Sequence, residues 1–74
     1  MSQSNQYQYQ IFNIKTVIEI TGISRSTIYE IIDPKSSYYD PNFPKPISLT
    51  KNRIGWVSKE IYDWIESKIA QRKK

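Results

Sequence analysis

The sequence predicts a mainly α-helical domain with one small β-hairpin, arranged as a winged helix-turn-helix. Three observations lead to this fold class. Two short helical patterns meet at a turn containing Gly22. Two stretches of alternating apolar and polar residues then follow, separated by a polar connection. A third helical pattern comes last, and 74 residues leave room for a single domain.

Each predicted helix has a polar residue suited to cap its start. Asn13 precedes the first helix, which Gly22 ends because glycine tolerates the left-handed backbone of a helix C-terminus. Ser24 precedes the second helix, predicted from about Arg25 to Ile32 and stopped by Pro34, and Ser58 is expected to cap the third. Apolar side chains recur at helical spacing in all three: Ile14, Val17 and Ile18; Ile28, Ile31 and Ile32; Ile61, Trp64, Ile65 and Ile69.

Between the second and third helices the pattern changes to that of a hairpin. Ile47 and Leu49 alternate with polar residues, as do Ile54 and Trp56. The polar run 50–53 is expected to be the connecting loop.

The remaining segments are a loop and a tail. Residues 34–44 form a loop that is long for so small a domain, and its Tyr38 and Tyr39 could either cover the core or form an exposed patch. Trp56 and Trp64 are expected in the core, since a chain this short needs its aromatic residues to fold. Residues 1–11 lack charge and apolar periodicity, so they are predicted to be a disordered tail before a domain at 12–74.

The composition argues against enzyme chemistry and against bound metal. The chain has no cysteine and no histidine, and its seven acidic residues are scattered along the sequence. A catalytic base of the usual kind, a cysteine nucleophile, a glycine-rich phosphate loop and a cysteine metal site are therefore missing. We expect no enzymatic activity, no cofactor and no metal. No apolar run suggests a membrane span or signal peptide, so the expected location is the cytoplasm, in association with the nucleoid.

The net charge of +4 is unevenly distributed. Residues 1–23 sum to zero and residues 24–33 to −1, whereas residues 34–57 carry +3 and residues 58–74 carry +2. The excess positive charge thus falls on the predicted hairpin region and on the end of the chain. A localised basic surface favours a polyanionic partner, and double-stranded DNA is the natural candidate for a helix-turn-helix.

The second helix carries a polar face opposite its isoleucines. At about 100° per residue, Arg25, Ser26, Tyr29 and Glu30 point away from the apolar side. These residues lie toward the helix N-terminus, which meets base edges when such a helix enters the major groove. Arg25 could donate two hydrogen bonds to guanine, Ser26 and Tyr29 could bond phosphate or base, and Glu30 could accept from cytosine N4. The alternative is an ordinary solvent-facing polar surface.

The hairpin loop offers a second contact. Lys51 and Arg53 flank its tip and could reach a phosphate or the minor groove. The alternative is that exposed turns are commonly charged. Lys45, on the approach to the hairpin, is a weaker candidate. The cations at 72–74 are explained by the dipole of the last helix, although they could add non-specific attraction.

Several motifs resemble one known family. Residues 17–29, VIEITGISRSTIY, closely resemble the "TGLSRSTIY" helix-turn-helix of AlpA-type prophage regulatory proteins. Residues 43–47, FPKPI, are similar to the "FPKPV" segment that leads into the wing of that family. Residues 54–57, IGWV, and 60–65, EIYDWI, resemble its "VGW" strand and "EVEAWI" final helix. The resemblance covers residues 14–65 with its motifs in the family's order.

The resemblance implies a MerR-like winged helix-turn-helix, related to phage excisionases and encoded by phages or integrated mobile elements. Two features depart from the family pattern: residues 36–42 lengthen the loop, and Glu30 stands where arginine is common. Glu30 replaces a phosphate-binding cation with an anion, so either the affinity for DNA or the preferred DNA sequence is expected to differ. By position, the residues implied to face DNA are Ser24, Arg25, Ser26, Thr27 and Tyr29 on the helix, and Lys51, Asn52 and Arg53 at the wing tip.

Three functional hypotheses follow. The first is a sequence-specific DNA-binding transcriptional regulator of a phage or mobile element, and the second is an excisionase that directs an integrase. The third is a protein-interaction adaptor that retains the fold and uses Tyr38 and Tyr39. A gel shift on random duplex at low salt separates the adaptor from the other two, and footprinting of attachment sites separates regulator from excisionase. One domain makes few base contacts, so we expect a homodimer or a cooperative array on DNA.

Overall fold

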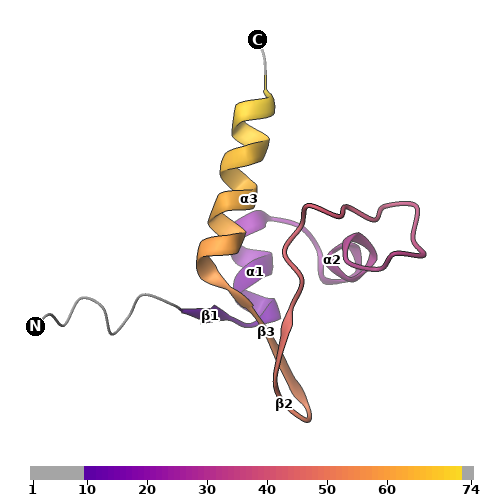
Figure 1. Cartoon of the computed structure of the whole chain (residues 1–74), viewed down its shortest axis with the longest axis vertical. Helices are drawn as coiled ribbons and strands as arrows, with labels where there is room; N and C mark the ends of the chain where they lie inside the picture. Colours follow the sequence, from indigo (N-terminus) through magenta and orange to yellow (C-terminus); the bar gives the residue numbers. More distant parts are fainter. Residues whose placement is uncertain (1–9, 73–74) are drawn as a thin grey trace, which may run out of the picture.

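The computed structural model describes residues 10–72 and confirms the predicted winged helix-turn-helix (Figure 1). Two short helices, α1 and α2, are followed by a loop, a β-hairpin and a longer helix, α3. Residues 1–9 of the predicted tail and residues 73–74 lie outside the described part of the chain. The elements are β1 (Ile11–Phe12), α1 (Ile14–Thr21), α2 (Arg25–Ile31), β2 (Ile47–Thr50), β3 (Arg53–Val57) and α3 (Ser58–Gln71).

The helix-turn-helix is stabilised by the predicted N-caps of both helices and by the predicted glycine at the end of α1. Asn13 accepts a hydrogen bond from the Thr16 amide on its side-chain oxygen, at 2.8 Å. Gly22 ends α1 in the left-handed conformation, with φ at 74°, and its N–H donates to the Ile18 carbonyl at 2.8 Å. Ser24 caps α2 by accepting from the Thr27 amide at 3.2 Å. Both helix starts and the turn between them therefore follow from local sequence.

The hairpin of β2 and β3, here called the wing, has a tighter turn than predicted. Thr50 and Arg53 pair as register partners, so the turn consists of Lys51 and Asn52 alone and the predicted loop 50–53 is two residues too long. The register is irregular between Ser48 and Thr50, as at a β-bulge.

Strand β1 was not predicted. The three-stranded sheet has the order β1-β3-β2, and β1 pairs antiparallel with β3, with Ile11 opposite Val57 and Phe12 opposite Trp56. The carbonyl of Gln10 also accepts a hydrogen bond from the Ser58 amide at 2.8 Å. The predicted tail boundary is therefore wrong at Gln10 and Ile11, because a two-residue strand is too short to show a period.

The start of α3 also differs from the prediction. Val57 occupies the N-cap position without a side-chain cap, and Ser58 is the first helical residue. Ser58 is buried, and its amide bonds to the Gln10 carbonyl. The Gln10 carbonyl thus accepts from one of the amides at the helix start that have no partner within the helix. The sequence predicts the Ser58 hydroxyl, and not a main-chain carbonyl, as the capping acceptor.

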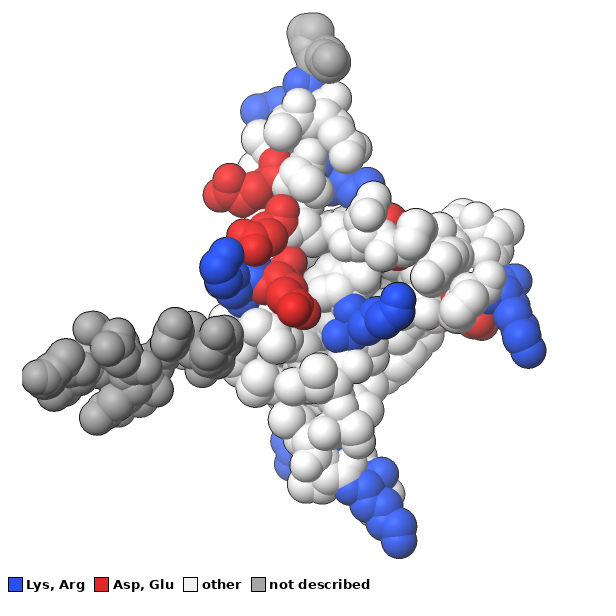
Figure 2. All heavy atoms as spheres, in the orientation of Figure 1, with Lys and Arg blue, Asp and Glu red and all other residues white. Residues whose placement is uncertain are grey.

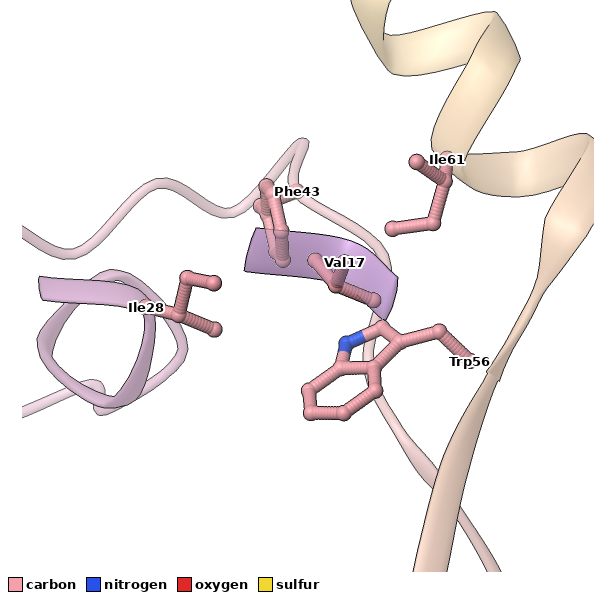
Figure 3. Close-up of a cluster of buried hydrophobic side chains, with 5 residues drawn as sticks. All are labelled: Val17, Ile28, Phe43, Trp56 and Ile61. Atoms are coloured by element: carbon pink, nitrogen blue, oxygen red, sulfur yellow. The ribbon is translucent and has the colours of Figure 1, made fainter. Parts of the chain in front are cut away.

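The hydrophobic core joins α1, α2, the loop before the wing, β3 and α3 (Figure 3). Val17 of α1 lies at its centre, surrounded by Ile28 of α2, Phe43 of the loop, Trp56 of β3 and Ile61 of α3, and all five are buried. The prediction for Trp56 is confirmed. Trp64 packs against the edge of this core and remains partly exposed, so it is less buried than predicted.

Candidate nucleic-acid interface

The outer face of α2 presents the polar side chains expected from helical periodicity. Ile28 is fully buried and turns α2 toward the core, so that the opposite side faces solvent. Arg25, Ser26, Tyr29 and Glu30 are all exposed, with Tyr29 at 41%. Seven residues of helix therefore offer a cation, hydroxyls and a phenol on a single exposed surface.

Ser24 and Thr27 lie at the start of this surface and are engaged in capping. The Ser24 hydroxyl donates to Thr27 Oγ1 at 2.9 Å and accepts from the Thr27 amide. Ser26 Oγ lies 3.5 Å from the Ser24 hydroxyl. These exposed hydroxyls order the N-terminus of α2, the end that a major-groove helix presents to base edges.

Glu30 lies on the same face but is held by the following loop. Its Oε1 accepts a hydrogen bond from the Ser36 hydroxyl at 2.6 Å. Ser36 Oγ in turn accepts from the Tyr38 amide at 3.0 Å. The carboxylate is thus already occupied by a donor of this chain, which would compete with any donor on a base.

The wing tip is a separate group of candidate residues. Lys51, Asn52 and Arg53 are exposed, and the wing projects away from α2 and from the end of α3 (Figure 1). In residues 10–72 the ion pairs join Lys59 to Asp63 and Lys68 to Asp40, so neither wing-tip cation is neutralised by a described ion pair. The structure therefore places the predicted residues in two clusters, one on α2 and one at the wing tip.

Lys45 belongs to neither cluster. It lines an open groove of about 700 Å³ between the 41–47 segment and α3, with Glu60 and Asp63 on the opposite wall. Positive side chains protrude at the wing tip, whereas acidic side chains gather over α3, where Glu60, Asp63 and Glu66 are exposed (Figure 2). This separation of charge favours an approach of DNA to the wing rather than to the acidic side of α3.

Sequence reasoning missed the role of Asp40, in the loop between α2 and the wing. Its carboxylate accepts from the Trp64 indole and from the Asn42 amide, and it pairs with Lys68. The hydrogen bond from the Asn42 amide, the Trp64 indole and the Lys68 charge together lower the pKa of Asp40 below its usual value, against the opposing effect of burial. The sequence Asp40-Pro41-Asn42 is a turn signal in which the aspartate bonds the amide two residues ahead. That signal could have been recognised, but the link to α3 could not.

Between residues 10 and 72 no group of three or more acidic side chains is placed to hold a metal ion. None of the helices described is long and apolar enough to cross a membrane.

An exposed second helix after a glycine turn, together with a cationic wing, defines the class of winged helix-turn-helix proteins. Within that class the family is clear. The model of the family described as "Prophage CP4-57 regulatory protein (AlpA)" matches residues 10–69, most of the chain. The protein belongs to this family, as the motif resemblance predicts.

Two relatives agree with this assignment. The chain is 37% identical over 65 residues to a protein of Escherichia coli K12 named "DNA-binding transcriptional activator AlpA", covering 88% of this chain and 93% of that protein. It is 33% identical over 67 residues to "Uncharacterized protein ORF88" of Enterobacteria phage P4, covering 90% of this chain and 69% of that protein. No solved structure matches the chain significantly.

Proposed function

We propose that this protein is a sequence-specific DNA-binding transcriptional regulator of a phage or integrated mobile element. The observation that carries the proposal is the exposed polar face of α2, fixed on a buried Ile28 and accompanied by an unneutralised cationic wing tip. The named activity of the Escherichia coli relative supports it. The role is one of binding and not of catalysis, and it would be carried out in the cytoplasm on the nucleoid.

In this proposal the residues on α2 and those at the wing tip make different kinds of contact with DNA. Arg25 donates to a guanine edge in the major groove, and Ser26 and Tyr29 bond a base or phosphate beside it. The N-terminus of α2, with the exposed hydroxyls of Ser24 and Thr27, faces the DNA beside these contacts. The wing-tip residues Lys51, Asn52 and Arg53 contact phosphate or the minor groove, and they position the protein without reading sequence. Lys45 adds only long-range attraction, because it lies in the groove beside α3.

Glu30 affects the interaction with DNA in one of two ways. It accepts from cytosine N4 if the Ser36 hydroxyl releases it, or it repels phosphate if it stays held. One domain offers few base contacts, so we expect two copies, as a dimer or a cooperative array, on adjacent half-sites. An integrase would be a further partner if the protein acts as an excisionase.

The test begins with selection of bound sequences from a random duplex pool. The selected site is then titrated with protein across a salt series. Roughly three to five phosphate contacts predict a slope of log affinity against log salt of about −3 to −4.5. A flat salt profile, or no binding at low salt, would reject DNA binding and favour the adaptor. Footprints confined to attachment-site DNA would favour the excisionase.

A further inference from the structure

We propose that Asp40 is a positioning residue for DNA recognition: it ties the C-terminal end of α2 to α3 and so fixes the angle at which α2 meets DNA. The inference rests on the proposed function, because it concerns how the DNA-reading helix is held. Asp40 lies in the loop between α2 and β2. This loop would thus contribute to recognition without contacting DNA.

The main chain of Asp40 closes the loop onto α2. Its amide donates to the carbonyl of Ile31, the last helical residue of α2, at 2.9 Å. Carbonyls in the last turn of a helix have no partner within the helix, so this bond caps α2 from outside. The Asp40 carbonyl accepts from the Phe43 amide at 3.0 Å, which leads directly to a buried core residue.

The side chain of Asp40 reaches α3. Oδ2 accepts from the Trp64 Nε1 at 3.2 Å and lies 3.5 Å from the Lys68 ammonium, while Oδ1 accepts from the Asn42 amide at 2.9 Å. Trp64 and Lys68 are one helical turn apart, so they share a face of α3. The Asp40 side chain is only 22% exposed, which strengthens these bonds relative to a pair in open solvent.

The aromatic rings reinforce this connection. Trp64 packs edge-to-face on Phe43 with centroids 4.8 Å apart, and the Lys68 ammonium lies 5.3 Å from the Trp64 ring centroid. The loop is therefore attached to α3 by the packing of Phe43 on Trp64 and by the ion pair of Asp40 with Lys68.

The orientation of α2 depends on such attachments because the helix is short. It has seven residues, of which only Ile28 is fully buried, and isolated helices of this length are not stable in water. The Gly22 turn holds its N-terminal end, and Asp40 holds its C-terminal end. A bidentate contact with a base edge requires a defined geometry, whereas flexible cations reach phosphates from many positions. Loosening the Asp40 link should therefore reduce sequence discrimination more than overall affinity.

The experiment compares Asp40→Ala and Asp40→Asn with Asp63→Ala as the matched control. Asp63 is an aspartate on α3 with a lysine partner, Lys59, at 3.0 Å, and replacing it changes the net charge equally. Dissociation constants are measured for the selected site and a scrambled duplex at one salt concentration, well below the melting temperature of each variant. We expect Asp40→Ala to lower the ratio of specific to non-specific affinity about tenfold, the loss expected from one misplaced base contact. Asp40→Asn should recover part of the ratio, because its amide oxygen can still accept one hydrogen bond.

If Asp40→Ala fails to fold, Trp64→Phe is the second variant, since it retains one aromatic ring near Phe43 while it removes the Nε1 donor together with part of the indole volume. A folded Trp64→Phe protein should also show a reduced ratio. An unchanged ratio in the folded variants, equal to that of Asp63→Ala, would overturn the positioning role. That result leaves DNA binding by the unmodified protein intact, whereas failure of the proposed function would abolish binding in every variant, including the unmodified chain.

Discussion

The indole Nε1 of Trp56 donates a hydrogen bond to the main-chain carbonyl of Pro44, 3.1 Å away and 12 residues earlier in the chain. Trp56 is fully buried in β3, and Pro44 follows the core residue Phe43. The Trp56 side chain therefore packs in the core and also fixes the end of the loop against the sheet. A buried donor or acceptor left unpaired costs free energy, so this bond is expected to contribute to specificity of packing as well as to stability.

Replacing Trp56 should separate the contribution of its hydrogen bond from that of its buried volume. Trp56→Phe retains a ring but leaves the Pro44 carbonyl without its donor, and we expect a loss of about 1–3 kcal/mol in the free energy of unfolding, with an additional loss from the smaller volume. Trp56→Ala should cost about 3–5 kcal/mol, which a domain this small would barely survive. Urea unfolding followed by circular dichroism measures both. Tyr38→Ala is the control, since Tyr38 is 67% exposed. Equal effects of Trp56→Phe and Tyr38→Ala would contradict the assignment.

Gly55 is required by the close approach of β1 to the wing. A Cβ at this position would collide with the Ile11 side chain and would lie 3.2 Å from Leu49 Cδ1. We expect Gly55→Ala to destabilise the fold by about 1–3 kcal/mol through this overpacking. The double variant Gly55→Ala with Ile11→Ala should recover part of the loss, because it removes the colliding side chain. If the loss of unfolding free energy in the double variant equals or exceeds the sum of the losses in the two single variants, the collision is not the cause.

Arg25 and Arg53 should differ in the kind of affinity that each supplies. Arg25→Ala should cost about 1–3 kcal/mol on the selected site, relax preference at one base pair and affect a scrambled duplex much less. Arg53→Ala should weaken binding to all duplexes about equally and reduce the salt slope by about one. Both variants are measured on both duplexes across a salt series. Equal losses on the two duplexes for Arg25→Ala would refute base reading by α2, and discrimination carried by Arg53 would assign that reading to the wing.

Asp40 should make stability depend on pH in the acid range. Its folded pKa is lowered, chiefly by the hydrogen bond from the Asn42 amide and also by Trp64 and the facing Lys68 charge. The ionised carboxylate therefore contributes stability above the unfolded pKa of about 3.9, and this contribution is lost as the pH falls through the lower folded pKa. We expect the difference in unfolding free energy between the unmodified protein and Asp40→Asn to be largest near neutral pH and to shrink in acid. Chemical unfolding from pH 2 to 7 tests this, and a difference that is independent of pH would exclude the carboxylate charge as its source.

The elements predicted well from sequence depend on neighbouring residues. Asn13 and Ser24 each cap a helix by accepting from an amide three residues ahead, and Gly22 ends α1 by adopting a backbone that other residues avoid. The helical spacing of the isoleucines predicts that the side of α2 carrying Ile28 is buried and that the opposite side is exposed, as the structure shows. Whether the exposed side chains contact DNA stays a prediction.

By itself, therefore, the sequence determined the starts of α1 and α2, the turn between these two helices, the position of the wing and the family of the protein. Only the tertiary structure decided that Ile11–Phe12 forms a strand on β3, that the Gln10 carbonyl and not a serine hydroxyl serves the start of α3, and that Asp40 joins α2 to Trp64. The physical reason is the range of the interactions. Caps and turns are satisfied within a few residues, so their signals are visible in short windows. The bond between Asp40 and Trp64 spans 24 residues and exists only after α3 has packed beside the loop.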